Sequence, residues 1–244
     1  MKTSNHLLRR LTAALLAAVL ALSIALPVFA SDDGDTIYIN SVSDLLSLAR
    51  SCAYDQWSVG KTVILQKDLS LEGMLWEPIP SFSGQFKGNG HTISDLTITG
   101  QYSPAGLFGI VEEQGSIESL SVRGVVSVSD SADTTTGGIV GVNHGTLINC
   151  QFTGVVTGDS EVGGIVGRNE SEGTIDHGTA RAIVTGKSST GGIAGYNLGA
   201  ITGCTNVGSI NTEYPEASLD TDGFTAKMVD YINNKTVSYT HLRA

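Results

Sequence analysis

Short apolar stretches alternate with glycine and small polar residues along most of the chain, and this alternation repeats. Four copies of one phrase carry it, at 105–111 (AGLFGIV), 137–143 (GGIVGVN), 163–169 (GGIVGRN) and 191–197 (GGIAGYN). The second glycines of the copies are spaced 32, 26 and 28 residues apart. A period in this range, rich in Gly, Ile and Val, predicts a stacked solenoid.

Each repeat contains three short apolar patches separated by Gly, Ser, Thr and Asn. One column of like positions is Ile117, Leu147, Ile175 and Ile201, and further columns lie three, five and eight residues after it. Three strands and three turns in a repeat of 26–28 residues predict one coil of a right-handed parallel β-helix, an all-β fold. The column eight residues on begins at Val125 and is expected to face inward. Asn206 and Ser209 weaken the last coil, which we expect to fray or to turn outward there.

The repeated glycines and asparagines are predicted to be structural. They are Gly106, Gly109, Gly138, Gly141, Asn143, Gly164, Gly167, Asn169, Gly192, Gly195 and Asn197. Glycine permits turns with positive φ and close approach between rungs. The asparagines recur five residues after the second glycine, and we expect them to form a hydrogen-bonded ladder between rungs. Val111 stands at the matching place in the first copy, so the ladder should stop before it.

The chain begins with a targeting segment. Lys2, Arg9 and Arg10 precede a run of mostly apolar residues over 11–29, and a cleavage-like site ends at Ala30. Residues 1–30 are therefore predicted to be a secretory signal peptide, and a retained membrane anchor is the alternative.

The mature part of the chain divides into three segments. Residues 31–100 are predicted to hold an N-terminal cap and the first coils. Ser41 and Asp44 form a capping-box pattern before an apolar helical face, so a helix should cover the open end of the first rung. Residues 101–211 hold the β-helix repeats.

The last segment, 212–244, is predicted to be an irregular tail. Within it, residues 223–234 have the spacing of a short amphipathic helix that can cap the C-terminal end. Residues 237–244 (VSYTHLRA) share nothing with the repeats and resemble translated adaptor sequence. We therefore expect the protein to continue beyond residue 236 with other sequence.

Composition excludes some partners. The chain holds 14 Lys+Arg and 24 Asp+Glu, and its formal net charge is −10. Such a surface repels phosphate backbones and anionic lipid, so we expect neither nucleic acid nor, after signal cleavage, membrane as a partner. Cys52, Cys150 and Cys204 do not form a disulfide-scaffold pattern. Cys150 and Cys204 are expected two rungs apart, too far for a bond, and are interpreted as small buried hydrophobes.

The repeated GGI[VA]GxN phrase, together with WEPI at 76–79 and GNGHTI at 88–93, resembles the GLUG-motif family. The resemblance covers about residues 62–211. GLUG repeats occur in large secreted and surface proteins of bacteria, including some that carry proteases or adhesive modules. The resemblance implies a parallel β-helix-like stack and an extracellular address. It implies no catalytic residue.

Other residues that suggest chemistry have structural explanations as well. His91 is a candidate base or ligand but lacks a partner at a sensible spacing, so a turn or packing role is favoured. Arg123 and Arg181, at equivalent positions, can bind an anionic sugar or simply relieve charge repulsion, which is favoured. Asp176 and His177 are adjacent in a strand and should point to opposite faces.

Acidic pairs suggest a further possibility. Asp159 with Glu161, and Glu170 with Glu172, can collect weak calcium, although solvated loop charge is favoured because no calcium-loop pattern is present. No metal, cofactor or catalytic constellation is predicted.

The sequence therefore favours a non-catalytic extracellular scaffold or adhesive module of a bacterial surface protein, secreted or held at the cell surface. Its partner would be an extracellular glycan or a host or matrix protein, bound by the loops at 101–104, 129–136, 157–162 and 185–190. One alternative is a carbohydrate-active β-helix enzyme or binding module. Another is a non-catalytic segment of a larger surface protease. Fold alone does not separate these.

Overall fold

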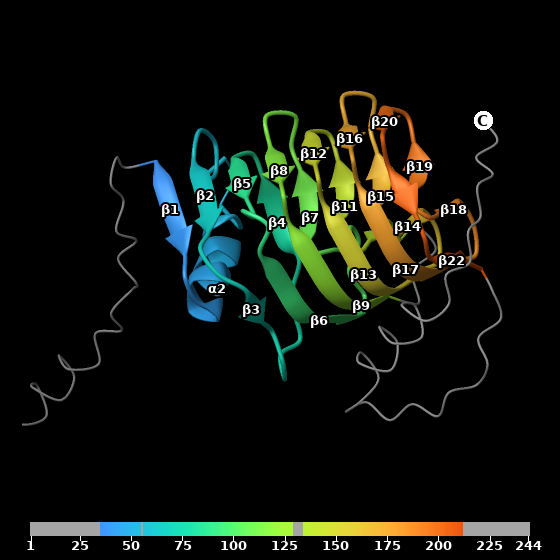
Figure 1. Ribbon diagram of the computed structural model, residues 1–244, viewed down its shortest axis with the longest axis horizontal. Helices are drawn as coiled ribbons and strands as arrows, with labels where there is room; N and C mark the ends of the chain where they lie inside the picture. The colour runs from blue at the N-terminus through green and yellow to red at the C-terminus, as the bar shows by residue number, and fades with distance from the viewer. Residues whose placement is uncertain (1–34, 55, 129–133, 212–244) are drawn as a thin grey trace, which may run out of the picture. The chain divides into compact units, whose positions relative to one another are not determined.

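The structure of the protein, a computed structural model, describes residues 35–54, 56–128 and 134–211. The predicted signal peptide at 1–30 and the predicted tail at 212–244 lie outside the described residues. Within them, one α-helix and a series of short strands wind into about six stacked coils (Figure 1). The expected all-β solenoid with parallel strands is confirmed.

Equivalent strands of successive coils form four parallel sheets. Sheet A contains β1 (Thr36–Ile39), β2 (Thr62–Leu65), β5 (Gln85–Lys87), β8 (Ser116–Glu118), β12 (Thr146–Ile148), β16 (Thr174–Asp176) and β20 (Ala200–Thr202). Sheet B contains β3 (Leu69–Ser70), β6 (Thr92–Gly100), β9 (Ser121–Val128), β13 (Gln151–Thr157), β17 (Thr179–Thr185) and β21 (Thr205–Asn206), with β22 (Ser209–Ile210) also on β17. Figure 1 shows both sheets running the length of the stack.

The other two sheets complete each coil. Sheet C contains β4 (Ile79–Phe82), β7 (Phe108–Val111), β11 (Val140–Asn143), β15 (Val166–Asn169) and β19 (Ala194–Asn197). Sheet D contains only two-residue strands, β10 (Thr136–Gly137), β14 (Val162–Gly163) and β18 (Thr190–Gly191). Sheet D lies between sheets B and C along the chain and was not predicted, because strands of two residues carry no readable periodicity.

The predicted columns pair in register. Leu147 is bonded between Ile117 and Ile175, and Ile175 pairs with Ile201 in turn. The column eight residues on also pairs in register. Val155 and Ile183 of this column are buried, but the expectation that Val125 faces inward is wrong. Val125 is half-buried, whereas the next residue, Val126, is fully buried. Alternation along β9 makes Val122 and Val126 the inward positions and leaves Val125 on the other face.

The end of the last coil is more regular than expected. Thr205 and Asn206 pair with β17, and Ser209 and Ile210 pair with it again two residues later. The coil therefore does not fray at Asn206 and Ser209, although its pairing with β17 is interrupted between these two residues. Asn206 lies over Gly192, which has no side chain and leaves room for the asparagine amide.

Helix α2 (Val42–Ser51) closes the N-terminal end of the core. The Ser41 hydroxyl accepts a hydrogen bond from the Asp44 N–H, and the Asp44 carboxylate accepts one from the Asn40 N–H, so the predicted cap is present. The helix contacts β1 and β4. Leu45 and Leu48 are fully buried beneath it, as an amphipathic helix over an apolar core requires.

Candidate functional site

The loops between sheets B and D, which the sequence suggested as a binding surface, are bonded to one another. The Thr134 hydroxyl accepts hydrogen bonds from the Asp159 and Ser160 N–H groups of the next coil, at 2.9 and 3.4 Å. The Lys187 and Ser188 N–H groups of the coil after that donate to the Asp159 carbonyl at 3.0 and 3.1 Å. Residues 129–133 of this surface lie outside the described part of the chain. The described loops of successive coils are therefore stacked on one another and held by hydrogen bonds between coils.

The acidic loop residues are ion-paired, so the interpretation of Asp159, Glu161 and Glu170 as solvated charge is wrong. Lys187 Nζ lies 2.7 Å from Asp159 Oδ1. Arg168 holds Glu161 and Glu170 at 2.6 Å each, and its guanidinium lies 4.8 Å from the centre of the Tyr196 ring. The hydrogen bond that Arg168 donates to the Glu170 carboxylate is the main cause of the raised pKa of Arg168. These carboxylates are thereby neutralised locally.

Calcium finds little support at these loops. Their carboxylate oxygens already accept from basic side chains, whereas a cation site needs several oxygens that are free to turn inward. Within residues 35–54, 56–128 and 134–211, no group of three or more His, Cys, Asp or Glu side chains can hold a metal ion. Glu172 is exposed, and its pKa is lowered chiefly by a hydrogen bond from Ser171.

The asparagine ladder is present. Asn143 Nδ2 donates to Asn169 Oδ1 at 2.7 Å, and Asn169 Nδ2 donates to Asn197 Oδ1 at 2.8 Å. Asn143 and Asn169 are fully buried. Val111 is the residue paired with Asn143 in the preceding coil, and the buried Asn143 Oδ1 has no hydrogen-bond partner. The ladder ends where the sequence indicated, and its first amide oxygen is left unpaired.

The motif glycines serve close approach rather than turn conformation. Positive φ angles fall at other residues, among them Ser119, Asn149 and His177 at the corner between sheets A and B. A Cβ on Gly138 would contact the Phe152 ring, and one on Gly164 would lie 2.9 Å from Ala180 Cβ. Of the two reasons proposed for the glycines, only the steric one applies to these positions.

His91 has a partner that sequence spacing did not reveal. Its Nδ1 lies 3.1 Å from Asp68 Oδ1, one coil earlier, and the same carboxylate oxygen accepts from the Thr92 N–H at 2.8 Å. The Thr92 hydrogen bond is the main cause of the lowered pKa of Asp68, and His91 adds to it. The statement that His91 lacks a partner is therefore wrong. Both side chains of the pair are accessible to solvent.

Asp176 and His177 also depart from expectation. Their side chains do not point apart, because Asp176 Oδ1 lies 2.9 Å from His177 Nδ1. His177 follows β16 in a left-handed turn with φ of 52°, which rotates its side chain away from strand alternation. Both side chains are accessible, and they lie within hydrogen-bonding distance of each other at the corner between sheets A and B.

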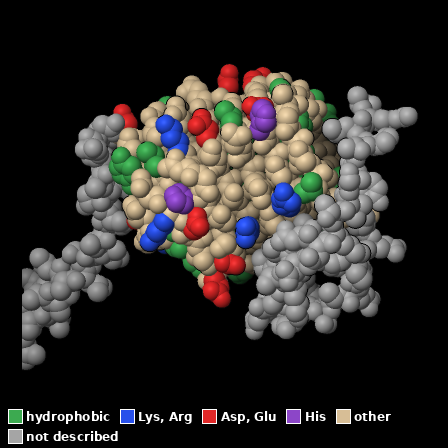
Figure 2. Space-filling model, viewed as in Figure 1, with side chains coloured by type: hydrophobic (Ala, Val, Ile, Leu, Met, Phe, Trp, Pro, Cys, Tyr) green, Lys and Arg blue, Asp and Glu red, His purple; other side chains and the backbone are tan. Residues whose placement is uncertain are grey.

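Arg123 and Arg181 occupy equivalent positions on sheet B, as predicted, with Thr153 paired between them. Both arginines are exposed. The space-filling view in Figure 2 shows basic and acidic side chains standing singly or in small groups on the face drawn, without a continuous patch of one charge. An anionic polymer would meet separate local groups on that face.

The cysteines are free thiols, and two are fully enclosed. Burial raises the pKa of both Cys52 and Cys150 to about 12, so neither is a thiolate nucleophile at neutral pH. Cys204 is less buried, and its thiol donates to the Ile175 carbonyl at 3.4 Å. Gly178 is the equivalent position in the coil between Cys150 and Cys204. The space beside it is filled by Ile165 and by the Cys204 sulfur.

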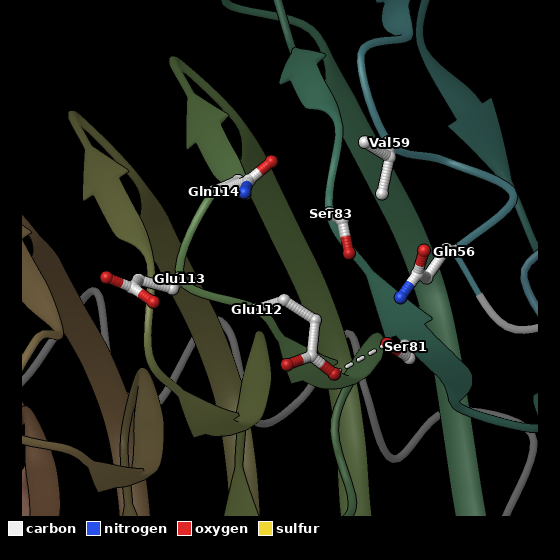
Figure 3. Close-up of a pocket in the computed structure, with 7 residues that line it drawn as sticks. All are labelled: Gln56, Val59, Ser81, Ser83, Glu112, Glu113 and Gln114. Carbon is white, nitrogen blue, oxygen red and sulfur yellow. Dashed lines mark hydrogen bonds between the residues drawn. The ribbon is translucent and has the colours of Figure 1, made fainter.

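A polar pocket of about 340 Å³ was not anticipated from the sequence (Figure 3). Its lining residues come from the loop after α2, from β4 and the corner that follows it, and from the turn after β7. They are Gln56, Val59, Ser81, Ser83, Glu112, Glu113 and Gln114. The Ser81 hydroxyl donates to Glu112 Oε1 at 2.7 Å, which fixes one wall, and Figure 3 shows Gln56 facing that pair across the pocket.

The loop that forms the other wall is also fixed. Ser58 is almost fully buried, and its hydroxyl accepts a hydrogen bond from the Ser83 N–H at 2.9 Å. The pocket therefore offers hydroxyl, amide and carboxylate groups on ordered backbone. The repeat spacing does not predict this pocket, because two of its lining residues, Gln56 and Val59, come from a loop outside the periodic part of the chain.

Comparisons with known proteins support the fold but do not identify the function. No family model matches the chain. Halomucin of Haloquadratum walsbyi is 31% identical over 155 residues, which cover 58% of this chain and 2% of halomucin. A protein of Evansella cellulosilytica provisionally named a Gly-rich membrane protein is 30% identical over 137 residues, covering 41% of this chain and 16% of that protein. The chain thus spans a small part of these relatives.

One solved structure is similar in fold. It is a protein from Bacteroides ovatus provisionally named an immunoglobulin A1 protease. It matches with a TM-score of 0.52 and 16% identity, over 76% of this chain and 80% of that one. At this identity the likeness concerns the fold alone. Within the described residues, no helix has the length and apolar character to cross a membrane.

Proposed function

We propose that the chain is a non-catalytic scaffold or adhesive module of a bacterial surface protein, exported and built from GLUG-type repeats. The observation that carries the proposal is the use of polar groups to hold coils together. Asn143, Asn169 and Asn197 bond from rung to rung, and Lys187 joins one loop to the next through Asp159. A stack bonded in this way presents its loops at a fixed spacing of about 4.8 Å per rung.

The relatives support a place at the cell surface. One is named halomucin and another a Gly-rich membrane protein, and the region matched is a small fraction of each. We therefore place the chain as one module within a larger surface protein. In that setting a stiff stack of coils holds neighbouring domains apart and displays its loops to the surroundings.

The proposed ligand is an extracellular glycan or a matrix protein. Two surfaces offer suitable groups: the stacked loops at 157–162 and 185–190, and the polar pocket between Gln56 and Glu112. Sugar hydroxyls both donate and accept hydrogen bonds, so they suit a lining of amides, hydroxyls and carboxylates. The pocket groups are pre-positioned by the Ser81 and Ser58 hydrogen bonds, which lowers the cost of ordering them on binding.

The test is a binding screen with the mature chain, residues 31–244, against immobilised glycans and matrix proteins. Gln56→Ala with Gln114→Ala removes two pocket amides, and Ser160→Ala with Ser188→Ala removes two loop hydroxyls. Glu72→Gln, an exposed change away from both surfaces, is the matched control. We expect binding to at least one glycan or matrix protein, reduced by one pair of substitutions and unchanged by the control.

Three outcomes would contradict the proposal. Release of products from a bound glycan or protein would make the module an enzyme. Retention of the full chain inside the cell, when it is expressed in a bacterial host with residues 1–30 intact, would remove it from the cell surface. Binding that neither substitution pair affects would place the ligand elsewhere and contradict the assignment to these two surfaces.

A further inference from the structure

The polar pocket lies at the corner between sheets C and A, where the turns of successive coils differ in length. Two residues join β4 to β5, whereas four join β7 to β8. The short turn, Ser83–Gly84, lies between two longer segments, the loop that precedes β2 and the turn at 112–115 (Figure 3). The pocket is therefore a recess that the difference in turn length produces.

The backbone around this recess is closely packed. A Cβ on Gly84 would lie 2.6 Å from the Lys61 carbonyl oxygen, and one on Gly115 would lie 2.5 Å from the Phe82 carbonyl oxygen. Neighbouring turns therefore hold one another in place across the coils. The volume of about 340 Å³ is that of a site for a small ligand or a short segment of a glycan.

The lining supplies both donors and acceptors of hydrogen bonds. The Ser81 hydroxyl donates its proton to Glu112 Oε1 at 2.7 Å. Figure 3 shows the Ser83 hydroxyl and the Gln56 side chain directed toward that pair. Hydroxyl and amide groups donate and accept, as sugar hydroxyls do, so the two sets are complementary. Val59, the one apolar side chain among the described lining residues, is 44% exposed and can contact the C–H groups of a sugar ring.

The charge of the pocket is negative and is not neutralised by an ion pair. Among the seven described lining residues, Glu112 and Glu113 are carboxylates and none is Lys, Arg or His. Within the described part of the chain neither carboxylate forms an ion pair, whereas Asp159 is paired with Lys187. A ligand carboxylate or sulfate held here would meet two like charges, which opposes binding. A neutral hydroxyl that donates to a carboxylate makes a stronger hydrogen bond than it makes to a neutral acceptor.

We propose that the pocket binds sugar units that carry no negative charge, and that Glu112 and Glu113 exclude units with a carboxylate or sulfate. This inference rests on the proposed function, because it specifies which glycans the module recognises at this site. Glu112 orients the Ser81 hydroxyl through Oε1, and its charge selects among ligands. Glu113 adds a second negative charge from the same turn.

Binding of the mature chain, residues 31–244, to an array of matched glycan pairs tests the inference. Each pair contains a neutral oligosaccharide and a uronate oligosaccharide of the same linkage and length, such as a glucan and the corresponding glucuronan. We expect the wild type to bind the neutral member about tenfold more tightly. Gln56→Ala with Gln114→Ala removes two amides from the lining and should weaken that binding.

A charge-removal variant tests the cause of the preference. Glu112→Gln with Glu113→Gln removes both charges, and the new amide oxygen can still accept from the Ser81 hydroxyl. We expect this variant to bind the uronate member within about threefold of the neutral one. Glu72→Gln with Glu77→Gln, the matched control, removes the same charge from exposed positions outside the pocket and should keep the wild-type preference. Circular dichroism should show that all variants are folded.

The results that would overturn the inference differ in what they mean for the proposed function. Equal or tighter binding of the uronate member by the wild type would overturn the charge selection and leave glycan binding in place. An unchanged preference in Glu112→Gln with Glu113→Gln would show that other groups set it. Neutral-glycan binding that Gln56→Ala with Gln114→Ala leaves unaffected would place the ligand outside the pocket. Binding to no glycan would overturn the inference, and the proposed ligand class would fail with it only if matrix proteins were not bound either.

Discussion

The two halves of the stack fill their interiors in different ways. The coils between Thr62 and Val111 hold large aromatic residues, and Trp76, Phe82, Phe86 and Phe108 are all buried. The ring centre of Phe108 lies 5.4 Å from the ring centre of Phe82 and 5.4 Å from that of Phe86. The coils between Gly137 and Asn197 hold Ile and Val, with Phe152 as the one fully buried aromatic ring among their described residues.

This difference explains why only the second half repeats visibly in the sequence. At Gly138 and Gly164, atoms of the next coil lie so close to the backbone that only glycine fits. Glycine must therefore recur at this position in every such coil. Where aromatic rings fill the space, several combinations of side chains give the same volume. The indole of Trp76, which donates to the Leu107 carbonyl at 3.1 Å, is a local solution with no counterpart in the glycine-rich coils.

Removing an aromatic ring from the first half should have the largest effect. Phe108→Ala leaves a cavity between Phe82 and Phe86, and we expect it to lower the free energy of unfolding by about 3–5 kcal/mol. Ile165→Val, a small deletion at a fully buried position of the second half, should cost only about 0.5–1.5 kcal/mol. Urea denaturation followed by circular dichroism measures both. Equal losses would mean that the aromatic cluster adds no stability of its own.

The columns of the repeat were predictable because they follow from steric contact at fixed positions. Ile117, Leu147 and Ile175 were correctly aligned from glycine spacing alone. The register of the first half was not predicted in this way. Leu69 pairs with Ile93 across a shorter coil that lacks the Gly-Gly phrase. Asp68, next to Leu69, was therefore missed as the partner of His91, although both residues are visible in the sequence.

A glycine test should have the next largest effect and separate the two halves further. In Gly164→Ala the new methyl group would meet the Gly192 carbonyl and Ala180 of the second half, and we expect a loss of about 1–3 kcal/mol. In Gly109→Ala, at the boundary with the aromatic half, the nearest atom is the Pro80 carbonyl oxygen at 3.1 Å, so the loss should be smaller. Thermal denaturation of the two variants gives the order. The reverse order would contradict the steric explanation of the motif.

The asparagine ladder predicts a graded series. Asn169→Val breaks bonds to Asn143, Asn197 and the Gly173 carbonyl in a buried setting, so it should cost the most, about 1–3 kcal/mol. Asn143→Val breaks fewer bonds and removes an unpaired buried oxygen, so it should cost less. Asn197→Val, on the exposed last coil, should cost least. A flat series in chemical denaturation would show that the amide bonds contribute nothing beyond packing.

The outward-facing groups were less predictable than the core. Their partners depend on turn conformation and on which coil lies next, and neither is set by the period. His177 contacts Asp176 because its φ is positive, and the pocket at Glu112 draws Gln56 from a loop outside the repeats. Arg168 was not singled out in the sequence, yet it binds two carboxylates.

The smallest expected effect belongs to the exposed pair in the first half. The pKa of Asp68 is lowered from 3.8 by the Thr92 hydrogen bond and by His91. A carboxyl whose pKa is lower in the folded state adds stability above its unfolded pKa and loses that contribution as the pH falls through the folded value. Proton titration by NMR should therefore give Asp68 a pKa below 3.8, closer to that value in His91→Ala. Because the Asp68 carboxyl is exposed, Asp68→Asn should leave the melting temperature at pH 7 almost unchanged. Glu161→Gln removes the ion pair with the half-buried Arg168, so it should lower the melting temperature measurably.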